Sequence, residues 1–331
     1  MVSKKYAKNI VSESIAPPMN KESMNEYKKM MEDQKKAGNS VEVNMLYTIQ
    51  DSIVKGSFHM GASWVMNLKG TKPVQMELAN THDCDEVLGF AGSDPDNPRE
   101  LGAEVELWLE DEKYIINKSC FVFIPKGMKH CPMLIRKVDK PFFGFGAMPV
   151  SNYGRPWEGK YKEASYEGKK GSPALKYAKY IVTEKPAMPQ LSPDAKRMFE
   201  DQKKAGNSIE FIQFAKIQDS IVKGSFGMGA SWLMNLKGTR SVQVEMAHTH
   251  DCDEILGFAG SDPYNPRELN GEIELWLEDE KHTINKSCLV FIPRGMKHCP
   301  MLIKKIDKPI LNFGATIDSN YERPWEEKYN Q

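Results

Sequence analysis

The chain has 331 residues, and its 45 lysines and arginines balance 45 aspartates and glutamates, so the formal net charge is zero. This balance gives no overall attraction to nucleic acid or to an anionic membrane surface. No apolar run approaches the ~20 residues that a membrane-spanning helix needs, and the polar start of the chain lacks the apolar core of a secretory signal. We therefore expect a cytoplasmic protein with neither a nucleic-acid nor a membrane partner.

Two long segments of the sequence are nearly the same. Residues 32–147 and 200–315 align without a gap, and 88 of the 116 aligned positions are identical. A repeat of this length is a whole domain rather than the unit of a solenoid. The sequence thus predicts a tandem duplication, with domains at 1–170 and 171–331 joined by a polar linker at 162–172. Surfaces this alike favour a monomeric pseudo-dimer with approximate two-fold symmetry, or a higher homo-oligomer.

Each copy begins with a charged segment that favours a helix, at residues 20–36 and 194–204, and a glycine-asparagine pair ends each segment. Short apolar segments follow, separated by turn residues, and no helical pattern lies between them. This arrangement is typical of an all-β sandwich or barrel. In the first copy the predicted strands are residues 54–58, 63–68, 74–78, 104–109, 114–116, 121–124 and 133–135.

Four residues of the second copy have the spacing of a metal site. His248 and His250 are two residues apart, so on a strand their side chains project from the same face. Glu254 follows after a bend, and His298 comes directly after a Pro-x-Gly turn. Three imidazoles and one carboxylate suit a divalent transition metal, and iron, manganese, nickel, zinc and copper all remain open.

These segments resemble the motifs of the cupin superfamily. Its first motif is HxH followed by three or four residues and a glutamate, and its second is PxGxxH, which Pro293, Gly295 and His298 fit. The resemblance covers residues 53–147 and 221–315. It implies two double-stranded β-helix (jelly-roll) barrels, as in the bicupins, each with a metal inside and a short helical N-terminal extension. It also implies that the extensions pack at the contact between the barrels or on the other barrel.

The two copies differ at one candidate ligand. Asn80 stands where the second copy has a histidine, and the first copy keeps His82, Glu86 and His130. Two histidines and one carboxylate are a set that leaves coordination positions open. We expect one metal per barrel, bound more weakly in the first, with the asparagine either adding an amide oxygen or holding a water molecule.

Other polar residues carry less specific signals. Outside the motifs, His59 and His282 have no histidine partner in the other copy and are expected at the surface or in loops. The cysteines are expected to be reduced, because each copy holds three and there is no secretory signal. Among them, Cys84 and Cys252 are expected to be packed or solvated thiols, and Cys131 and Cys299 to point away from the site. A solvated strand face is expected for Glu104, Glu106, Glu272 and Glu274, with an acid–base pair as the minor alternative.

A metal in a barrel does not name a reaction. The sequence favours an enzyme that acts on a small oxygen-rich metabolite by redox or lyase chemistry at a mononuclear metal. A non-catalytic metal-dependent binding protein and a sugar-phosphate isomerase remain as alternatives, the isomerase with Lys126, Lys129, Arg294 and Lys297 as its only basic candidates. Phe90, Phe123, Met133 and Phe145 are expected either to line an apolar pocket or, more simply, to form the core.

Overall fold

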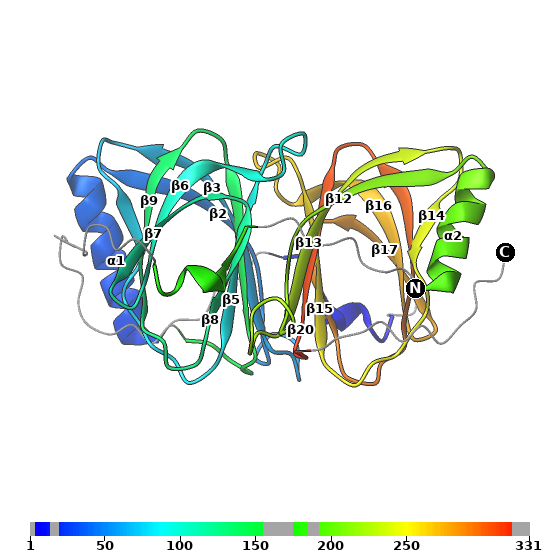
Figure 1. Cartoon of the computed structure of the whole chain (residues 1–331), viewed down its shortest axis with the longest axis horizontal. Coiled ribbons are helices and arrows are strands. Elements are labelled where there is room, and N and C mark those ends of the chain that lie inside the picture. Colours follow the sequence, from blue (N-terminus) through cyan, green and yellow to red (C-terminus); the bar gives the residue numbers. More distant parts are fainter. Residues whose placement is uncertain (1–3, 14–19, 155–174, 184–191, 320–331) are drawn as a thin grey trace.

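Each half of the chain folds into a barrel of two antiparallel sheets, as Figure 1 shows for the computed structural model. The structure describes residues 4–13, 20–154, 175–183 and 192–319. The predicted linker at 162–172 and the predicted domain boundary after residue 170 lie outside these ranges. The prediction of an all-β chain with two jelly-roll barrels is confirmed.

The first barrel joins a six-stranded sheet to a four-stranded sheet, with strand orders β11-β8-β5-β10-β3-β2 and β4-β9-β6-β7. Its strands are β2 (Ser40–Ile49), β3 (His59–Lys69), β4 (Val74–Glu77), β5 (Glu86–Gly92), β6 (Glu100–Leu109), β7 (Glu112–Lys118), β8 (Cys120–Ile124), β9 (His130–Val138), β10 (Phe142–Met148) and β11 (Ile181–Val182).

The second barrel repeats this topology, with strand orders β1-β18-β15-β20-β13-β12 and β14-β19-β16-β17. Its strands are β1 (Ile10–Val11), β12 (Ser208–Ile217), β13 (Gly227–Lys237), β14 (Val242–Glu245), β15 (Glu254–Gly260), β16 (Glu268–Leu277), β17 (Glu280–Lys286), β18 (Cys288–Ile292), β19 (His298–Ile306) and β20 (Ile310–Thr316).

The predicted helices are present at the outer ends of the molecule (Figure 1). They are α1 (Lys21–Lys36) and α2 (Pro193–Lys204). The Asn20 side chain caps the first helix by accepting a hydrogen bond from the backbone N–H of Ser23. After the helix, Gly38 has a φ of +81°, a conformation that glycine adopts without strain. Neither described helix is long and apolar enough to cross a membrane.

The segments before the helices cross to the opposite barrel. Two short 3-10 helices, η1 (Ala7–Asn9) and η2 (Ala178–Tyr180), lead into β1 and β11. Strand β1 pairs with β18 of the second barrel, and β11 pairs with β8 of the first. The exchange is reciprocal, as expected for a self-complementary contact between two similar units. The prediction that the leading segments reach the other barrel is confirmed for these residues, whereas α1 packs on β2 and β4 of its own barrel.

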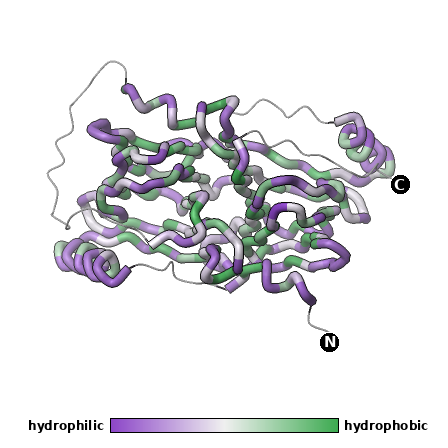
Figure 2. Tube along the Cα trace, turned by 90° about the horizontal axis from the view of Figure 1, so that it is seen from below, coloured by the Kyte–Doolittle hydropathy of each residue, from purple (hydrophilic) through white to green (hydrophobic). Residues whose placement is uncertain are grey.

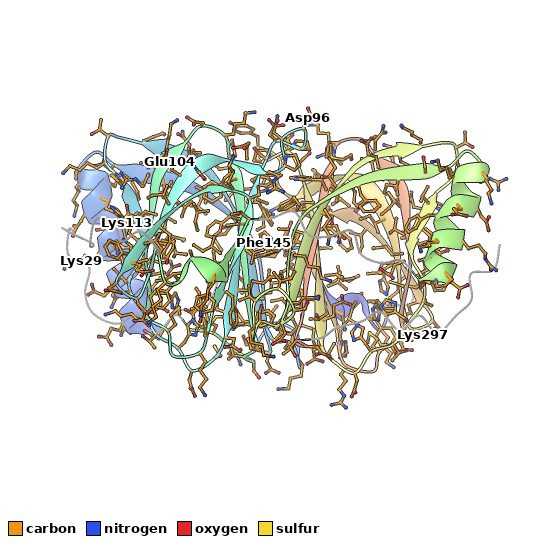
Figure 3. The ribbon with its side chains drawn as sticks, viewed as in Figure 1. Lys29, Asp96, Glu104, Lys113, Phe145 and Lys297 are labelled. Atoms are coloured by element: carbon orange, nitrogen blue, oxygen red, sulfur yellow. The ribbon has the colours of Figure 1, made fainter. Side chains whose placement is uncertain are left out.

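Apolar side chains form one core inside each barrel and a third core between the barrels. Along β8, Val122 faces the interior of the first barrel, whereas Phe121 and Phe123 face the second barrel. This alternation follows from the two-residue period of a strand. Figure 2 shows the apolar strands gathered at the centre and the hydrophilic helices outside. Phe145 lies at this centre in Figure 3, and its ring centroid is 5.0 Å from that of Phe313 in the other barrel.

The structure corrects one predicted strand and confirms the simpler expectation for the phenylalanines. Residues 54–58 form a turn rather than a strand, and Val54 and Phe58 are apolar because they are buried in the core between the barrels. Phe123 and Phe145 belong to that same core, as the simpler interpretation predicted, and do not line a pocket inside the first barrel. Phe90 lies in the interior core of the first barrel, and Met133 packs against it, as the simpler interpretation predicted.

Candidate metal centres

Three of the predicted residues come together inside the first barrel. Nε2 of His82 and Nε2 of His130 each lie 3.2 Å from the same oxygen, Oε2 of Glu86. Glu86 begins β5, His130 begins β9, and His82 lies in the loop before β5. All three are nearly buried, with at most 9% of any residue exposed. The cluster is one of three groups among the described residues whose ligand atoms are close enough together to hold a metal ion.

Backbone carbonyls fix which nitrogen of each imidazole faces the cluster. Nδ1 of His82 lies 2.7 Å from the carbonyl oxygen of Cys84, and Nδ1 of His130 lies 3.1 Å from that of Met128. A carbonyl oxygen only accepts hydrogen bonds, so Nδ1 carries a proton in both rings. Nε2 is then the nitrogen that presents its lone pair to a cation, which is the usual arrangement around metal-binding histidines.

Hydrogen bonds join the two motif segments of the first barrel. The backbone N–H of Gly127 donates to the carbonyl oxygen of His82, at 2.9 Å. The carboxylate of Asp85 accepts from the backbone N–H of Lys126, at 2.8 Å. The second barrel repeats both bonds, with His250 and Asp253 as the acceptors. The sequence Thr-His-Asp-Cys-Asp-Glu therefore supplies metal-ligand candidates and also the acid that holds the opposite turn.

The second barrel contains the equivalent cluster. Nε2 of His250 lies 3.2 Å and Nε2 of His298 3.3 Å from Oε2 of Glu254. The fourth predicted residue, His248, lies beside His298, with ring centroids 4.1 Å apart, and is farther from His250, at 5.8 Å. The structure therefore brings all four residues into one region, with His248 at its edge.

The clustered charges shift one another's protonation. Burial alone raises the pKa of the Glu86 carboxyl, but hydrogen bonds from His130 and His82 outweigh burial and lower the pKa to about 2. Burial lowers the pKa of His82, but hydrogen bonds to Cys84 and Glu86 outweigh it and raise the pKa to about 10. The pKa of Glu254 is lowered and that of His250 raised in the same way. His248 differs, because burial and the charge of His298 lower its pKa to about 4.

Asn80 occupies the same position in the first barrel as His248 in the second. Each pairs through its backbone with the histidine that begins the opposite strand, His130 or His298. The Asn80 side chain is buried, and its amide N–H donates to the carbonyl of Leu78 at 3.2 Å. Its Oδ1 is buried with no hydrogen-bond partner among the described residues. An unpaired buried acceptor is costly, so this oxygen suits a cation or a bound water.

Several other predicted positions differ from expectation. His59 and His282 are buried rather than exposed: Nδ1 of His59 lies 3.1 Å from Oε1 of Gln50, and Nε2 of His282 lies 3.4 Å from a Glu280 oxygen. Glu106 is also buried, on the outer face of β6, where Trp108 and Arg136 donate hydrogen bonds to it at 2.8 and 2.6 Å. Because these partners hold the Glu106 carboxylate outside the barrel, Glu106 is not part of an acid–base pair at the metal site.

One of the two cysteine predictions is confirmed and the other is wrong. Sγ of Cys84 and Sγ of Cys252 lie 3.6 and 3.5 Å from Nδ1 of the neighbouring histidines, on the side of each ring opposite the glutamate. They are packed thiols, as expected. The prediction for Cys131 and Cys299 was wrong, because both belong to the interior cores of their barrels. The cysteine and the proline after it lie in a β-bulge, so the alternation of side chains breaks there.

A small cavity reaches the first cluster from outside. Its volume is about 270 Å³, and it is lined by Asn20, His82, Asp83, Cys84, Val150, Asn152, Tyr153 and Gly154. The Tyr153 ring stands edge-on to His82, with centroids 6.2 Å apart. This volume lies just below the ~300–1,000 Å³ of ordinary ligand pockets, which favours a molecule of few heavy atoms.

Neither a protein-family model nor a curated protein sequence matches this chain. Solved structures do match it. An oxalate decarboxylase structure, described for its substrate binding mode, covers 87% of this chain and 77% of its own, at 10% identity and a TM-score of 0.50. A point mutant of the Bacillus subtilis enzyme gives the same coverage and TM-score at 9% identity. A structure described for the Mn(II) centres of that enzyme covers 94% and 87%, at 10% identity and a TM-score of 0.48. At these identities the first two likenesses establish the fold, which is the bicupin fold that the motifs predicted.

Proposed function

We propose that this chain, which has the bicupin fold, is a metal-dependent enzyme that acts on a small oxygen-rich metabolite by redox or lyase chemistry. The observation that carries the proposal is the buried His–Glu–His cluster of the first barrel, because three protein ligands leave coordination positions open and one of them, His82, also lines a cavity. A structural metal usually has its coordination shell closed by protein ligands, whereas a catalytic metal keeps a position open for substrate.

The proposed ligands are those that the spacing predicted. They are His82, Glu86 and His130 in the first barrel, and His248, His250, Glu254 and His298 in the second. Nitrogen and carboxylate donors suit manganese and iron, and also nickel, zinc or copper. Manganese is the first candidate to test, because the fold is shared with an oxalate decarboxylase that has Mn(II) centres. We propose one metal per barrel, bound more weakly in the first.

The residues around the first cluster have definite tasks in this proposal. A bound divalent metal would chelate substrate oxygens and stabilise developing negative charge. The carbonyls of Cys84 and Met128 hold the two imidazoles in position. The Tyr153 ring stands edge-on to His82 and lines the cavity together with the amide side chains of Asn20 and Asn152. This lining suits a small carboxylate or enediol.

The basic residues do not favour the isomerase alternative. Lys126 forms an ion pair with Asp83 at 2.7 Å, and Arg294 pairs with Asp251, with all four side chains mostly exposed. Lys297 is partly exposed beside Glu278, whose carboxylate accepts a hydrogen bond from the Lys297 backbone N–H at 3.1 Å. Cations that are paired with neighbouring aspartates at the surface do not form the phosphate-binding cluster that such an isomerase needs. The other alternative is a non-catalytic protein that binds a small molecule through its metal. The activity assay described below distinguishes it from an enzyme.

Metal analysis of the full chain, purified without a chelating tag, tests the sites. After the metal-free protein is loaded with Mn²⁺, we expect two ions per chain, one after His250→Ala, and two after His282→Gln, which alters a buried histidine outside the clusters. Oxalate and related small dicarboxylates are then assayed for formate, CO₂ and O₂ uptake, with His130→Ala as the inactive variant. Full metal content in His250→Ala protein would contradict the ligand assignment. Bound ligand without turnover across these substrates would point to a binding protein.

A further inference from the structure

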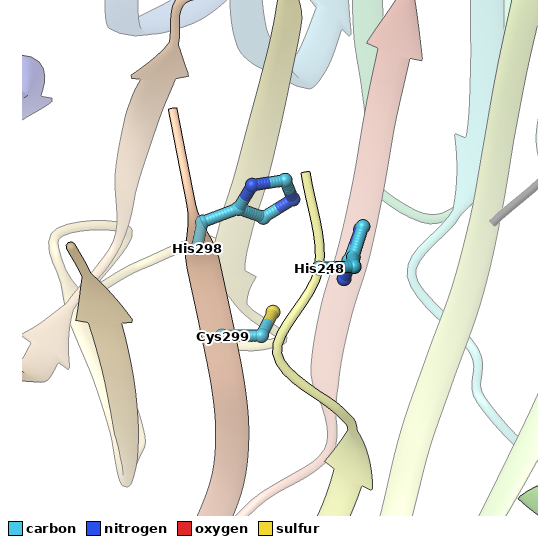
Figure 4. A group of neighbouring side chains, drawn as sticks. All are labelled: His248, His298 and Cys299. Atoms are coloured by element: carbon cyan, nitrogen blue, oxygen red, sulfur yellow. The ribbon is translucent and has the colours of Figure 1, made fainter. Parts of the chain in front are cut away.

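The second barrel holds a further group of possible ligands, which shares two histidines with the proposed metal site and adds a cysteine that the proposed function does not use. His248, His298 and Cys299 are buried, and each offers a ligand atom, with the three atoms within 4.8 Å of one another. Figure 4 shows His298 and Cys299 at the start of β19 and His248 on the neighbouring loop. Their donors are two nitrogens and one sulfur.

The backbone explains why these three side chains converge. His248 and His298 form a pair in which each backbone N–H donates to the other's carbonyl at 3.0 Å. Residues directly opposite one another in an antiparallel pair project from the same face, so the two rings meet. Cys299 has a φ of +65° and lies in the bulge of β19. The bulge turns its side chain toward the barrel interior, where Cys299 is 3% exposed.

Both imidazoles are already oriented as ligands. Nδ1 of His248 donates to the carbonyl of Met246 at 2.8 Å, and Nδ1 of His298 donates to that of Met296 at 3.0 Å. Nε2 is therefore the coordinating nitrogen of each ring. In tetrahedral zinc sites the metal–nitrogen and metal–sulfur distances of about 2.0–2.1 and 2.3 Å place ligand atoms roughly 3.5 Å apart. The ligand atoms of this group lie within 4.8 Å of one another, so binding an ion would draw the three side chains together.

We propose that His248, His298 and Cys299 form a second metal position in the second barrel, selective for a thiophilic cation such as Zn²⁺ or Cu⁺. Thiolate sulfur favours these ions, whereas the Glu254 carboxylate favours harder ions such as Mn²⁺. Binding converts the Cys299 thiol to a thiolate and releases its proton to solvent. Nε2 of His298 has one lone pair, so the two positions exclude each other, and the chemistry of the ion decides which is filled.

The first barrel provides the internal control. Cys131 has the same backbone conformation as Cys299, with a φ of +62°, and is also buried. Asn80 replaces the first histidine, and among the described residues of the first barrel only His82, Glu86 and His130 form a metal-binding group. The thiophilic position is therefore specific to the second barrel, and one substitution distinguishes the barrels.

Cobalt titration of the metal-free full chain tests the proposal, because thiolate coordination to Co²⁺ produces a sulfur-to-metal charge-transfer band in the near ultraviolet. We expect this band in the parent, with the intensity of one thiolate per chain. Cys299→Ser and His248→Asn should abolish it, whereas Cys131→Ser, Cys252→Ser and Glu254→Gln should retain it. Asn80→His should double it, by completing the equivalent group around Cys131.

The same variants separate this proposal from the proposed function. Mn²⁺ binding in the second barrel, followed by electron paramagnetic resonance, should survive Cys299→Ser and be lost in Glu254→Gln. The cobalt band should instead be lost in Cys299→Ser and survive in Glu254→Gln. A parent without the band, or a band that persists in Cys299→Ser, would overturn the thiophilic position and leave the carboxylate site intact. Thermal unfolding checks that each variant is folded. If Cys299→Ser does not fold, loss of the cobalt band in His248→Asn protein is the result that tests the proposal.

Discussion

Asn80 is the residue that separates the two barrels most sharply. It has the same backbone pairing as His248 but presents a buried amide oxygen where the second barrel presents an imidazole. Amide oxygen is a weaker donor for a transition metal than imidazole nitrogen. The difference lies in one side chain, because the motif that follows both positions is the same six residues.

Asn80→His should strengthen Mn²⁺ binding in the first barrel by at least about tenfold, since even indirect changes around metal ligands alter affinity by about 10–100-fold. Competition with a chelator measures the effect in a His250→Ala background, where the second barrel is disabled. Asn80→Ala is the matched control and should weaken binding or leave it unchanged. Equal affinity of the first barrel with and without Asn80→His would mean that the position does not contribute a ligand.

Metal binding by the first barrel should strengthen as the pH rises. The pKa of His82 is raised to about 10 in the metal-free protein, so near neutral pH this imidazole carries a proton that an incoming cation must displace. Each displaced proton increases affinity by about tenfold per pH unit below that pKa. Mn²⁺ titrations at about pH 6.5 and 8.5, in the same background, measure this slope. An affinity independent of pH over this interval would contradict the assigned protonation.

At the scale of single residues, the sequence was sufficient to predict which side chains cluster where that clustering depends on local spacing. Two histidines at i and i+2, a glutamate after a bend and a histidine after a Pro-x-Gly turn identified the residues that cluster. It failed for Cys299, because a bulge changes which face a residue occupies and the sequence pattern alone does not reveal a bulge. It also failed for His59, whose burial depends on Gln50 and Tyr153, and these residues are brought together only by the fold.

The helices are attached to their barrels through a repeated glutamine contact. Nε2 of Gln34 donates to the carbonyl of Gln75 at 3.0 Å, and Oε1 of Gln34 accepts from the N–H of Gln75 at 2.6 Å. Gln202 makes the same two bonds with Gln243. The glutamine side chain thus acts as an extra strand residue at the edge strand β4 or β14, and protects backbone groups that are otherwise unpaired.

Gln34→Ala should lower the free energy of unfolding by about 1–3 kcal/mol, because it leaves a buried N–H and a buried carbonyl without partners. Chemical denaturation measures the loss. Glu32→Ala is the control on the same helix: its carboxylate is exposed and only 3.8 Å from Lys36, so we expect a change below about 0.5 kcal/mol. If both variants lost the same stability, the effect would belong to the helix rather than to the glutamine contact.

The sequence predicted the elements unevenly, for reasons specific to each. Both helices were found from their charged segments and their glycine-asparagine ends. Strand β2 was missed although Val41, Val43 and Met45 in its first half alternate with Glu42 and Asn44, a signal that was available. Strand β10 was missed because its glycines resemble a turn. The glycines in this sheet serve packing instead, since a Cβ on Gly89 would lie 2.4 Å from the Phe145 ring.

The whole molecule is built around the core that the two barrels share. Phe143 and Phe145 of the first barrel contact Phe313 of the second, with ring centroids 5.2 and 5.0 Å apart. Trp64 and Trp232 are fully buried in the same core, and β1 and β11 bind each barrel to the segment that precedes the other. Neither barrel therefore has a complete core or a complete six-stranded sheet by itself. The duplication in the sequence predicted two similar units, but their mutual dependence follows from which face of each sheet is apolar.

Phe313→Ala should destabilise both barrels together, by about 3–5 kcal/mol, because it leaves a cavity in the shared core. Phe90→Ala, inside the first barrel only, is the matched control. Equilibrium unfolding followed by hydrogen exchange and mass spectrometry reports each barrel separately. We expect protection to fall in β8 and β18 alike for Phe313→Ala, and more in the first barrel for Phe90→Ala. Loss of protection confined to the second barrel in Phe313→Ala protein would show that the barrels fold independently and that their contact is incidental to stability.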